Sequence, residues 1–223
     1  MLWVGQFGIE DGEAREETSW VGAFPDPARE RDDESSDVYV LVEPALPGSA
    51  EFCGEMKTAI GEAFHESKVS LTGGLLRSLR AAHENLREWN RKSMKEHWVA
   101  AGVSCLAAQG DNVYLAQVHP AAAVFFESGS VTLLRPELPE ASEPLGLYDE
   151  LRPDFRQLDL APGDRLLLLS PSLAARLDPQ ALAPLLALPG EEALPEIYRL
   201  ARDEPNCAAL LVAALPGPVP APR

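Results

Sequence analysis

Four strand-like segments follow one another between residues 98 and 137, and this run constrains the fold more than any other feature of the sequence. Their sequences are WVAAGVSCLAA, NVYLAQV, AAAVFFES and SVTLLRPE, over 98–108, 112–118, 121–128 and 130–137. Only the turn residues at 110–112, 119–120 and 128–129 separate them. Connections this short join antiparallel neighbours, because parallel strands need a crossover of a dozen or more residues. The run therefore predicts an antiparallel meander.

The remaining strands and helices lie in separate blocks along the chain. DVYVLVEP has the β-branched and aromatic residues of a strand that Pro44 closes, and CAALLVAAL is typical of a fully buried strand. The other expected strands cover 2–9, 19–24, 154–160 and 165–170, the last two as a pair, and the expected helices cover 54–67, 71–97, 172–177, 178–188 and 191–203. Such segregated elements predict an α+β fold, in a single domain over residues 1–215. Residues 1–36 are its divergent acidic part, and residues 216–223 are expected to form a flexible Pro-rich tail.

The charge of the chain bounds its partners. It carries 35 acidic and 19 basic residues, a net charge of −16, and half of that excess lies in residues 1–37. A surface this negative repels phosphate backbones and anionic headgroups, so we expect neither nucleic-acid nor membrane binding. The sequence has no apolar run of 18 residues and no basic segment at its start, which argues against a membrane span and a signal peptide.

The three cysteines, Cys53, Cys105 and Cys207, are far apart and form no C-x-x-C pair. This spacing fits neither a disulfide framework nor a zinc site. Cys105 and Cys207 have apolar neighbours and are expected to act as small buried hydrophobes. The pattern predicts a reduced, cytoplasmic protein.

Residues 71–97 show the strongest helical periodicity. One face is expected to be an apolar stripe of Leu71, Leu75, Leu79, Ala82, Leu86 and Trp89. The opposite face is charged, and Glu84–Arg87 and Glu88–Lys92 have the spacing of helical ion pairs. This face is typical of a solvated surface; the alternative is a docking surface for an acidic partner, such as the N-terminal segment of the same chain. His83, at the edge of the stripe, is expected to be packed rather than to bind a ligand.

The common catalytic motifs are absent, since no G-x-x-x-x-G-K-[ST], G-x-G-x-x-G, G-x-S-x-G or H-E-x-x-H occurs. His119 lies in a turn before Pro120, where it could be exposed. A nucleophile–base pair between His119 and Ser104 or Ser170 remains a minor alternative.

Several segments, in order and suitably spaced, resemble the type 2C (metal-dependent) serine/threonine protein phosphatases. DVYVLVEPALPGSAEFCGEM is similar to the family's first Asp-Gly turn, and residues 100–137 are similar to its central meander. LDLAPGDRLLLLSPSL resembles the segment that ends in Ser-Asp-Gly-Leu, and EPNCAALLVAAL resembles the last strand with its Asp-Asn pair. The resemblance covers residues 37–215 and implies an α-β-β-α sandwich of two stacked antiparallel sheets flanked by helix pairs. It also implies two manganese or magnesium ions between carboxylates, which activate an attacking water.

The same resemblance places the family's metal carboxylates on unsuitable residues. The first Asp-Gly falls on Glu43 and Pro44, and the Asp of Ser-Asp-Gly-Leu falls on Pro171. The Asp-Asn pair falls on Pro205 and Asn206. Proline has no side-chain oxygen, and a single carboxylate does not hold two divalent ions against their hydration shells. We therefore expect a degenerate metal site, with no catalytic residues and no metal cofactor.

Two further family features have no match, and the prolines have two interpretations. Residues 1–36 lack a convincing counterpart of the phosphate-binding arginine, and the Gly-Asp-Ser-Arg turn falls on residues 119–122.

The prolines are interpreted as strand terminators, since proline withdraws a backbone donor. Alternatively, the former cleft has become a binding groove, with small and apolar residues at its rim: Ala45, Leu46, Ala121 and Leu173.

Three functional hypotheses follow. The leading one is a non-catalytic pseudophosphatase domain that acts in signalling by binding a protein partner, such as a phosphoprotein or a kinase. The second is an active metal-dependent phosphoprotein phosphatase with relocated ligands, Glu43, Asp203 and one of Asp32 or Asp33, using Mn²⁺ or Mg²⁺. It requires at least three carboxylates within about 5 Å of one another. The third is an unrelated α+β interaction module, which a fold without two stacked antiparallel sheets would select.

Overall fold

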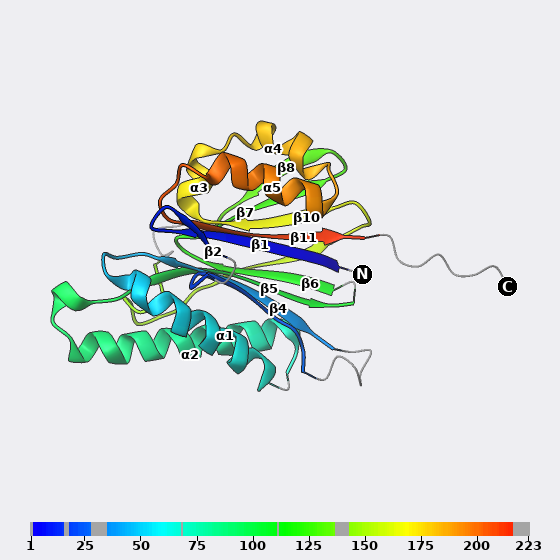
Figure 1. Cartoon of the computed structure of the whole chain (residues 1–223). Coiled ribbons are helices and arrows are strands. Elements are labelled where there is room, and N and C mark those ends of the chain that lie inside the picture. The colour runs from blue at the N-terminus through cyan, green and yellow to red at the C-terminus, as the bar shows by residue number, and fades with distance from the viewer. Residues whose placement is uncertain are drawn as a thin grey trace.

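The chain folds into four layers, helix–sheet–sheet–helix, with the two sheets stacked in the middle (Figure 1). The structure, a computed structural model, describes residues 2–15, 18–27, 35–67, 69–110, 112–136 and 143–215. Every strand pair in both sheets is antiparallel. The α+β sandwich expected from the sequence is confirmed. The expected tail over 216–223 lies outside the described residues.

The first sheet, sheet A, has the strand order β2-β1-β11-β10-β7-β8. Its strands are β1 (Leu2–Glu10), β2 (Glu13–Arg15), β7 (Ala122–Glu127), β8 (Ser130–Leu134), β10 (Arg165–Leu169) and β11 (Cys207–Ala214). All eight residues of β11 are buried, as CAALLVAAL predicts. Its even-numbered side chains join the core between the sheets, and its odd-numbered ones face the helices that cover sheet A.

The second sheet, sheet B, has the order β3-β4-β5-β6-β9. Its strands are β3 (Val21–Phe24), β4 (Asp37–Pro44), β5 (Ala101–Gln109), β6 (Asn112–Val118) and β9 (Asp154–Asp159). The β4 strand has the bounds expected from DVYVLVEP. Buried side chains of both sheets, among them Leu41, Leu115, Leu166 and Leu210, belong to one hydrophobic core.

The predicted meander is wrong in one respect, because its four strands are divided between the sheets. The β5–β6 hairpin belongs to sheet B and the β7–β8 hairpin to sheet A, so residues 119–121 cross from one sheet to the other. The same correction applies to the expected pair over 154–170, since β9 joins β6 and β10 joins β7 and β11. Short turns predict antiparallel order here but not which strands pair, because pairing is decided by burial across the whole sandwich.

Helices cover the two outer surfaces. On sheet B lie α1 (Cys53–His65) and α2 (Leu71–Lys92), and on sheet A lie α3 (Pro171–Arg176), α4 (Pro179–Leu186) and α5 (Gly190–Ala201), as Figure 1 shows. Two short 3-10 turns, η1 (Ser49–Phe52) and η2 (Lys95–His97), precede α1 and follow α2. Ser70 caps α2, accepting a hydrogen bond from the Gly73 amide over 3.3 Å.

The long helix α2 departs from the prediction at its C-terminal end. It stops at Lys92, not at residue 97, because Ser93 is extended and its hydroxyl bonds the Trp89 carbonyl over 2.9 Å. Most of the predicted stripe is buried, but Trp89 is 48% exposed. On the charged face, the predicted pairs Glu84–Arg87 and Glu88–Lys92 form, with N–O distances of 3.5 and 2.7 Å.

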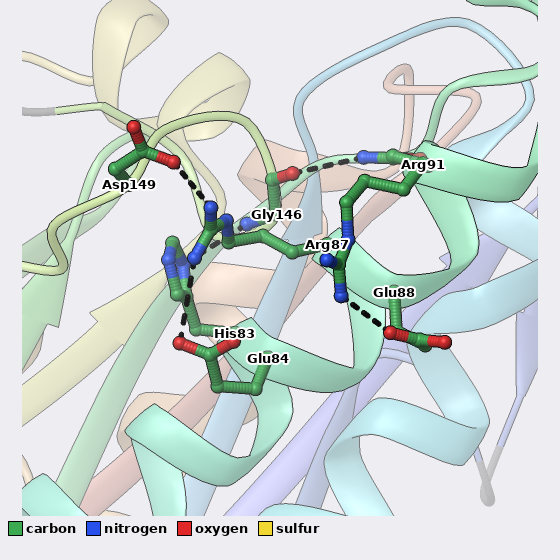
Figure 2. A network of polar contacts seen from close by, with 8 residues as sticks. His83, Glu84, Arg87, Glu88, Arg91, Gly146 and Asp149 are labelled. Carbon is green, nitrogen blue, oxygen red and sulfur yellow. Dashed lines mark hydrogen bonds and ion pairs between the residues drawn. The ribbon is translucent and has the colours of Figure 1, made fainter.

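A loop between β8 and β9 is fastened along α2, as Figure 2 shows. Asn90 donates to the Gly146 carbonyl over 2.9 Å, and the Gly146 amide donates to His83 Nδ1 over 3.2 Å. Arg87 pairs with Asp149. Gly146 has a φ of +94°, and a Cβ there would fall 2.7 Å from Leu86 Cβ, so the close approach needs glycine. His83 is buried, as expected of a packed histidine.

The three cysteines are free and buried, so the expectation of unpaired thiols is confirmed. Among the described residues, none of the helices combines the length and apolar character needed to span a bilayer.

Candidate functional site at the strand ends

Glu43 is the centre of the strand-end region in which the sequence places the degenerate metal site. It is the penultimate residue of β4 and is only 6% exposed. It lies near the hydroxyl of Ser170, which follows β10 in sheet A and lowers the pKa of the Glu43 carboxyl group. Ser170 is fully buried, and its Oγ accepts a hydrogen bond from the Ala208 amide over 2.8 Å. The ends of β4, β10 and β11 therefore meet around one carboxyl group.

The surroundings of Glu43 favour its neutral form. Burial raises its pKa from 4.5 to about 8, and the hydrogen bond from Ser170 offsets part of that rise. Its Oε1 has no hydrogen-bond partner among the described residues. A carboxyl group with this pKa is mostly protonated at pH 7, so Glu43 carries little negative charge there.

Backbone packing closes one side of the Glu43 site. Glu43 pairs with Gly102 across β4 and β5, and residues paired in this way project from the same face of the sheet. A Cβ on Gly102 would fall 1.8 Å from the Pro120 carbonyl oxygen. The crossover at Pro120 therefore lies against β5 beside Glu43, in space that a side chain at residue 102 would occupy.

Two of the buried thiols lie in the electrostatic neighbourhood of Glu43. Burial raises the pKa of Cys53 to about 12, and the negative charges of Glu43 and Glu10 contribute smaller increases. Burial, followed by Glu204 and Glu43, raises the pKa of Cys207 to about 12, and Arg176 opposes this. Thiols with such pKa values are protonated at neutral pH and are poor nucleophiles and metal ligands.

The three prolines of the predicted site have separate structural positions. Pro44 is the last residue of β4, Pro171 is the first residue of α3, and Pro205 precedes β11. The first helical position suits proline, because its missing N–H has no partner in the helix. The carbonyl of Pro205 accepts a hydrogen bond from Gly12 over 2.8 Å. Pro171 is thus a helix start as well as a residue that follows a strand.

Asn206 uses its side chain within the protein. Its Oδ1 accepts a hydrogen bond from the Asp11 amide over 2.9 Å, which fastens the turn between β1 and β2 to the start of β11. Glu10, beside that turn, accepts hydrogen bonds from the Thr18 hydroxyl and the Ser19 amide, both over 2.7 Å. The two side chains therefore hold the N-terminal hairpin in place.

The relocated ligands of the second hypothesis do not gather in the described part of the chain. The side chain of Asp203 is 75% exposed and its nearest cation is Arg202, at 3.8 Å, whereas Glu43 is buried. Asp32 and Asp33 lie outside the described residues. Within the described ranges, no group of three His, Cys, Asp or Glu side chains is arranged to hold a metal ion.

Other sequence-based candidates are also separated. His119 is exposed, whereas Ser104 and Ser170 are fully buried and bond Gln117 and Ala208, so no Ser–His pair forms among them. Ala121 and Leu173, expected at the rim of a groove, are buried; Ala45 and Leu46 are partly exposed.

The first 36 residues supply one described arginine, and it lies elsewhere. Arg15, in β2, is half exposed and pairs with Glu13 over 2.9 Å. Nothing in the described residues links this guanidinium to Glu43.

The donor groups of this site do not fit two hard divalent cations. Such ions need several carboxylate or carbonyl oxygens at 2.0–2.6 Å. Glu43 is the one carboxylate at the predicted positions, and a single carboxylate does not supply the oxygens that two such ions need. The amide oxygen of Asn206 is already bonded to a backbone amide. The other two positions at which the family has a metal-binding Asp carry Pro171 and Pro205, which offer no side-chain oxygen.

The sandwich is the fold of the type 2C serine/threonine phosphatases, so the resemblance seen in the sequence is confirmed at the level of the fold. The Streptococcus agalactiae (S. agalactiae) serine/threonine phosphatase superposes with a TM-score of 0.79 at 16% identity, over 97% of this chain and 100% of that one. Stp1 from Staphylococcus aureus superposes with a TM-score of 0.76 at 16% identity, over 97% and 96% of the two chains.

A third solved structure bears on the metal question. The catalytic domain of the phosphatase PstP, in complex with two manganese ions, superposes with a TM-score of 0.72 at 13% identity, over 96% of this chain and 99% of that one. No protein-family model and no curated protein matches the sequence. The similarity of the fold is therefore shown by the structures, at 13–16% sequence identity.

Sequence reasoning missed the contact between Glu43 and Ser170. The sequence suggested Ser170 only as a possible nucleophile, whereas its hydroxyl bonds Ala208 and lowers the pKa of the buried Glu43 carboxyl group. One local signal was present, since Glu43 directly follows the buried run YVLV. A carboxylate that ends such a run is often buried with it.

Proposed function

We propose that this chain is a phosphatase-like domain that has lost metal-dependent catalysis and acts by binding a protein partner in signalling. The observation that supports it is the state of Glu43, the one carboxylate at the predicted metal positions. It is enclosed, and burial raises its pKa to about 8, while Pro171 and Pro205 stand where the resemblance places further carboxylates. The similarity of the fold to solved phosphatases, together with the prolines at two of the expected carboxylate positions, supports a domain that acts by binding.

Retention of the scaffold is consistent with selection for a surface. The chain superposes on solved serine/threonine phosphatases over 97% of its length. If a partner recognises the outside of the sandwich, the fold must persist although the strand-end chemistry has gone. A phosphoprotein or a kinase is the class of partner that a domain derived from a phosphatase would meet.

Calorimetric titration with Mn²⁺, together with turnover of p-nitrophenyl phosphate in millimolar Mn²⁺, tests the loss of catalysis. We expect neither a binding heat nor turnover, whereas the PstP catalytic domain, titrated in parallel, binds the ion. Turnover that Glu43→Gln or Asp203→Asn abolishes would overturn the proposal and establish the alternative, an active phosphatase with relocated ligands. Asp32→Asn and Asp33→Asn complete that ligand set.

A further inference from the structure

An aromatic pair faces solvent at one end of the α1–α2 layer. The rings of Phe52, in η1, and Trp89, in α2, lie 5.2 Å apart between centroids at an interplanar angle of 60°. Trp89 is 48% exposed and Met94, just beyond α2, is 63% exposed. Large apolar side chains that gather on a surface mark interaction sites more often than isolated ones do.

Two hollows adjoin at Phe52, which lines both. The first, of about 130 Å³, lies between α1 and α2 and is mainly apolar, with Met56, Ala59 and Leu86 in its wall. The second, of about 300 Å³, lies between η1, the end of α2 and η2, with Trp89 and Trp98 in its wall. We call these two hollows together the aromatic groove.

The rim of the aromatic groove is acidic. Glu55 lines the first hollow, and Glu51 and Glu96 line the second. All three are exposed, and none of them forms an ion pair within the described part of the chain. By contrast, Glu84 and Glu88, on the charged face of α2, are paired with cations of that helix. The groove thus combines one exposed and two partly exposed aromatic rings with carboxylates that form no ion pair in the described residues, although His97 also lines it and Lys95 lies over the Trp98 ring.

This combination suits cationic side chains. An arginine or lysine can place its charge over an indole ring and near a carboxylate at the same time, and its aliphatic stem packs on apolar surface. The protein already shows one such contact, since Lys95 Nζ lies 5.7 Å from the centroid of the Trp98 ring. The net charge of −16 attracts a basic partner over a longer range.

We propose that the aromatic groove binds a basic, amphipathic segment of a protein partner. A cationic side chain of that segment occupies the hollow between Trp89 and Trp98, and an aliphatic one occupies the hollow between α1 and α2. This inference rests on the proposed function, for which it names a surface and the chemistry of the partner.

The groove is separate from the Glu43 site, although one loop joins them. That loop is held at its start by a hydrogen bond from the Ala45 amide to the Ala100 carbonyl, of 2.8 Å. Near its end, Ser49 Oγ accepts from the Ala100 amide over 3.0 Å. Binding in the groove therefore needs no change at the strand ends and no metal ion.

Fluorescence anisotropy with a labelled amphipathic peptide, arginines on one face and leucines on the other, tests the proposal. We expect the full chain to bind this peptide and to ignore the same peptide with glutamates in place of arginines. The triple variant Glu51→Gln, Glu55→Gln, Glu96→Gln is expected to bind about tenfold more weakly, because each exposed charge pair contributes modestly. Trp89→Ala is expected to lose about tenfold as well.

A matched triple variant, Glu66→Gln, Glu127→Gln, Asp159→Asn, removes the same charge from exposed positions elsewhere. It should retain at least half of the wild-type affinity. Equal weakening by both triples would overturn the proposal, because binding would then depend on net charge alone. Equal affinity for the two peptides would overturn it too. Trp89→Leu, which keeps an apolar side chain, covers the case in which Trp89→Ala fails to fold.

Two further readouts separate this proposal from its alternatives. Sedimentation velocity should show a monomer; self-association abolished by Trp89→Ala would assign the groove to a second copy of the chain and overturn the proposal. Peptide binding should be the same in Mn²⁺ and in EDTA. Turnover in Mn²⁺ with intact peptide binding would refute the loss of catalysis alone, whereas absent turnover with absent peptide binding would refute the groove alone.

Discussion

Only one loop separates Glu43 from Glu51, yet the two carboxyl groups have opposite surroundings. Glu43 is enclosed between the sheets, where burial holds its pKa at about 8. Glu51 is exposed at the rim of the aromatic groove, together with Glu55 and Glu96. The carboxyl group of Glu43 is buried, whereas the carboxyl groups of the groove are exposed to solvent. In a chain with this excess of acid, the location of a carboxylate says more about function than the number of carboxylates does.

The largest expected difference between the two regions is in the pH dependence of stability. In the unfolded chain Glu43 releases its proton near pH 4.5, whereas in the folded chain it keeps it until about pH 8. Between these values the folded state binds more protons, so the free energy of unfolding falls as pH rises. The loss is about 5 kcal/mol, at about 1.36 kcal/mol per pKa unit.

Urea unfolding of the wild type and of Glu43→Gln, from pH 4 to pH 9, measures this effect. The uncharged amide removes the contribution, so the difference between the two proteins should grow through that range and level off above pH 8. Two parallel curves would show that Glu43 is hydrated or paired in solution, and the contrast between the regions would disappear.

The second expected effect concerns the backbone that encloses Glu43. In Gly102→Ala the new Cβ would lie 1.8 Å from the Pro120 carbonyl oxygen, so β5 or the crossover must move. We expect a loss of about 3 kcal/mol in the free energy of unfolding, as for overpacked cores. Gly54 lies in α1, and a Cβ there would be 3.7 Å from its nearest neighbour, Ser19 Cβ, which is an ordinary contact. Gly54→Ala should therefore leave the free energy of unfolding unchanged or raise it by up to about 1 kcal/mol. Equal stability of the two variants would mean that the Glu43 site is open.

The smallest effect is expected at the groove. The triple variant Glu51→Gln, Glu55→Gln, Glu96→Gln changes exposed side chains without ion pairs in the described residues, so it should alter the free energy of unfolding by about 1 kcal/mol or less. Thermal unfolding measures this directly. A larger loss would indicate that these carboxylates stabilise the helix ends, which would weaken their assignment to a binding surface.

Local patterns predicted most elements, because each depends on neighbours in the sequence. The β4 strand could be placed from its β-branched run and Pro44, and α2 from its apolar stripe. The end of α2 could not be predicted, because residues 93–97 contain neither glycine nor proline. The helix ends where the backbone of Ser93 becomes extended. The division of β5–β8 between two sheets could not be read from turn residues, because both hairpins and crossovers accept short polar connections.

The resemblance placed five candidate residues at strand ends: Glu43, Pro44, Pro171, Pro205 and Asn206. Their assignment to a degenerate metal site stays a prediction. The partner of Glu43 could not be predicted, because Ser170 is distant in sequence and approaches only when the sheets stack. The groove escaped prediction since Trp89 continues the apolar spacing of α2 and so appeared to belong to the core; its exposure depends on where η1 and η2 lie.

The register between β1 and β11 has a consequence for how the chain is made. Leu2 pairs with Ala214, so β1 finds its central neighbour only after β11, far along the chain, has been synthesised. Until β11 is made, β1 and β10 each have an unpaired edge, facing the position between them that β11 will occupy. Sheet B needs only residues up to Asp159, so it can assemble while sheet A still waits for its middle strand. We therefore expect the two sheets to assemble one after the other, with the nascent chain most prone to aggregate just before β11 emerges.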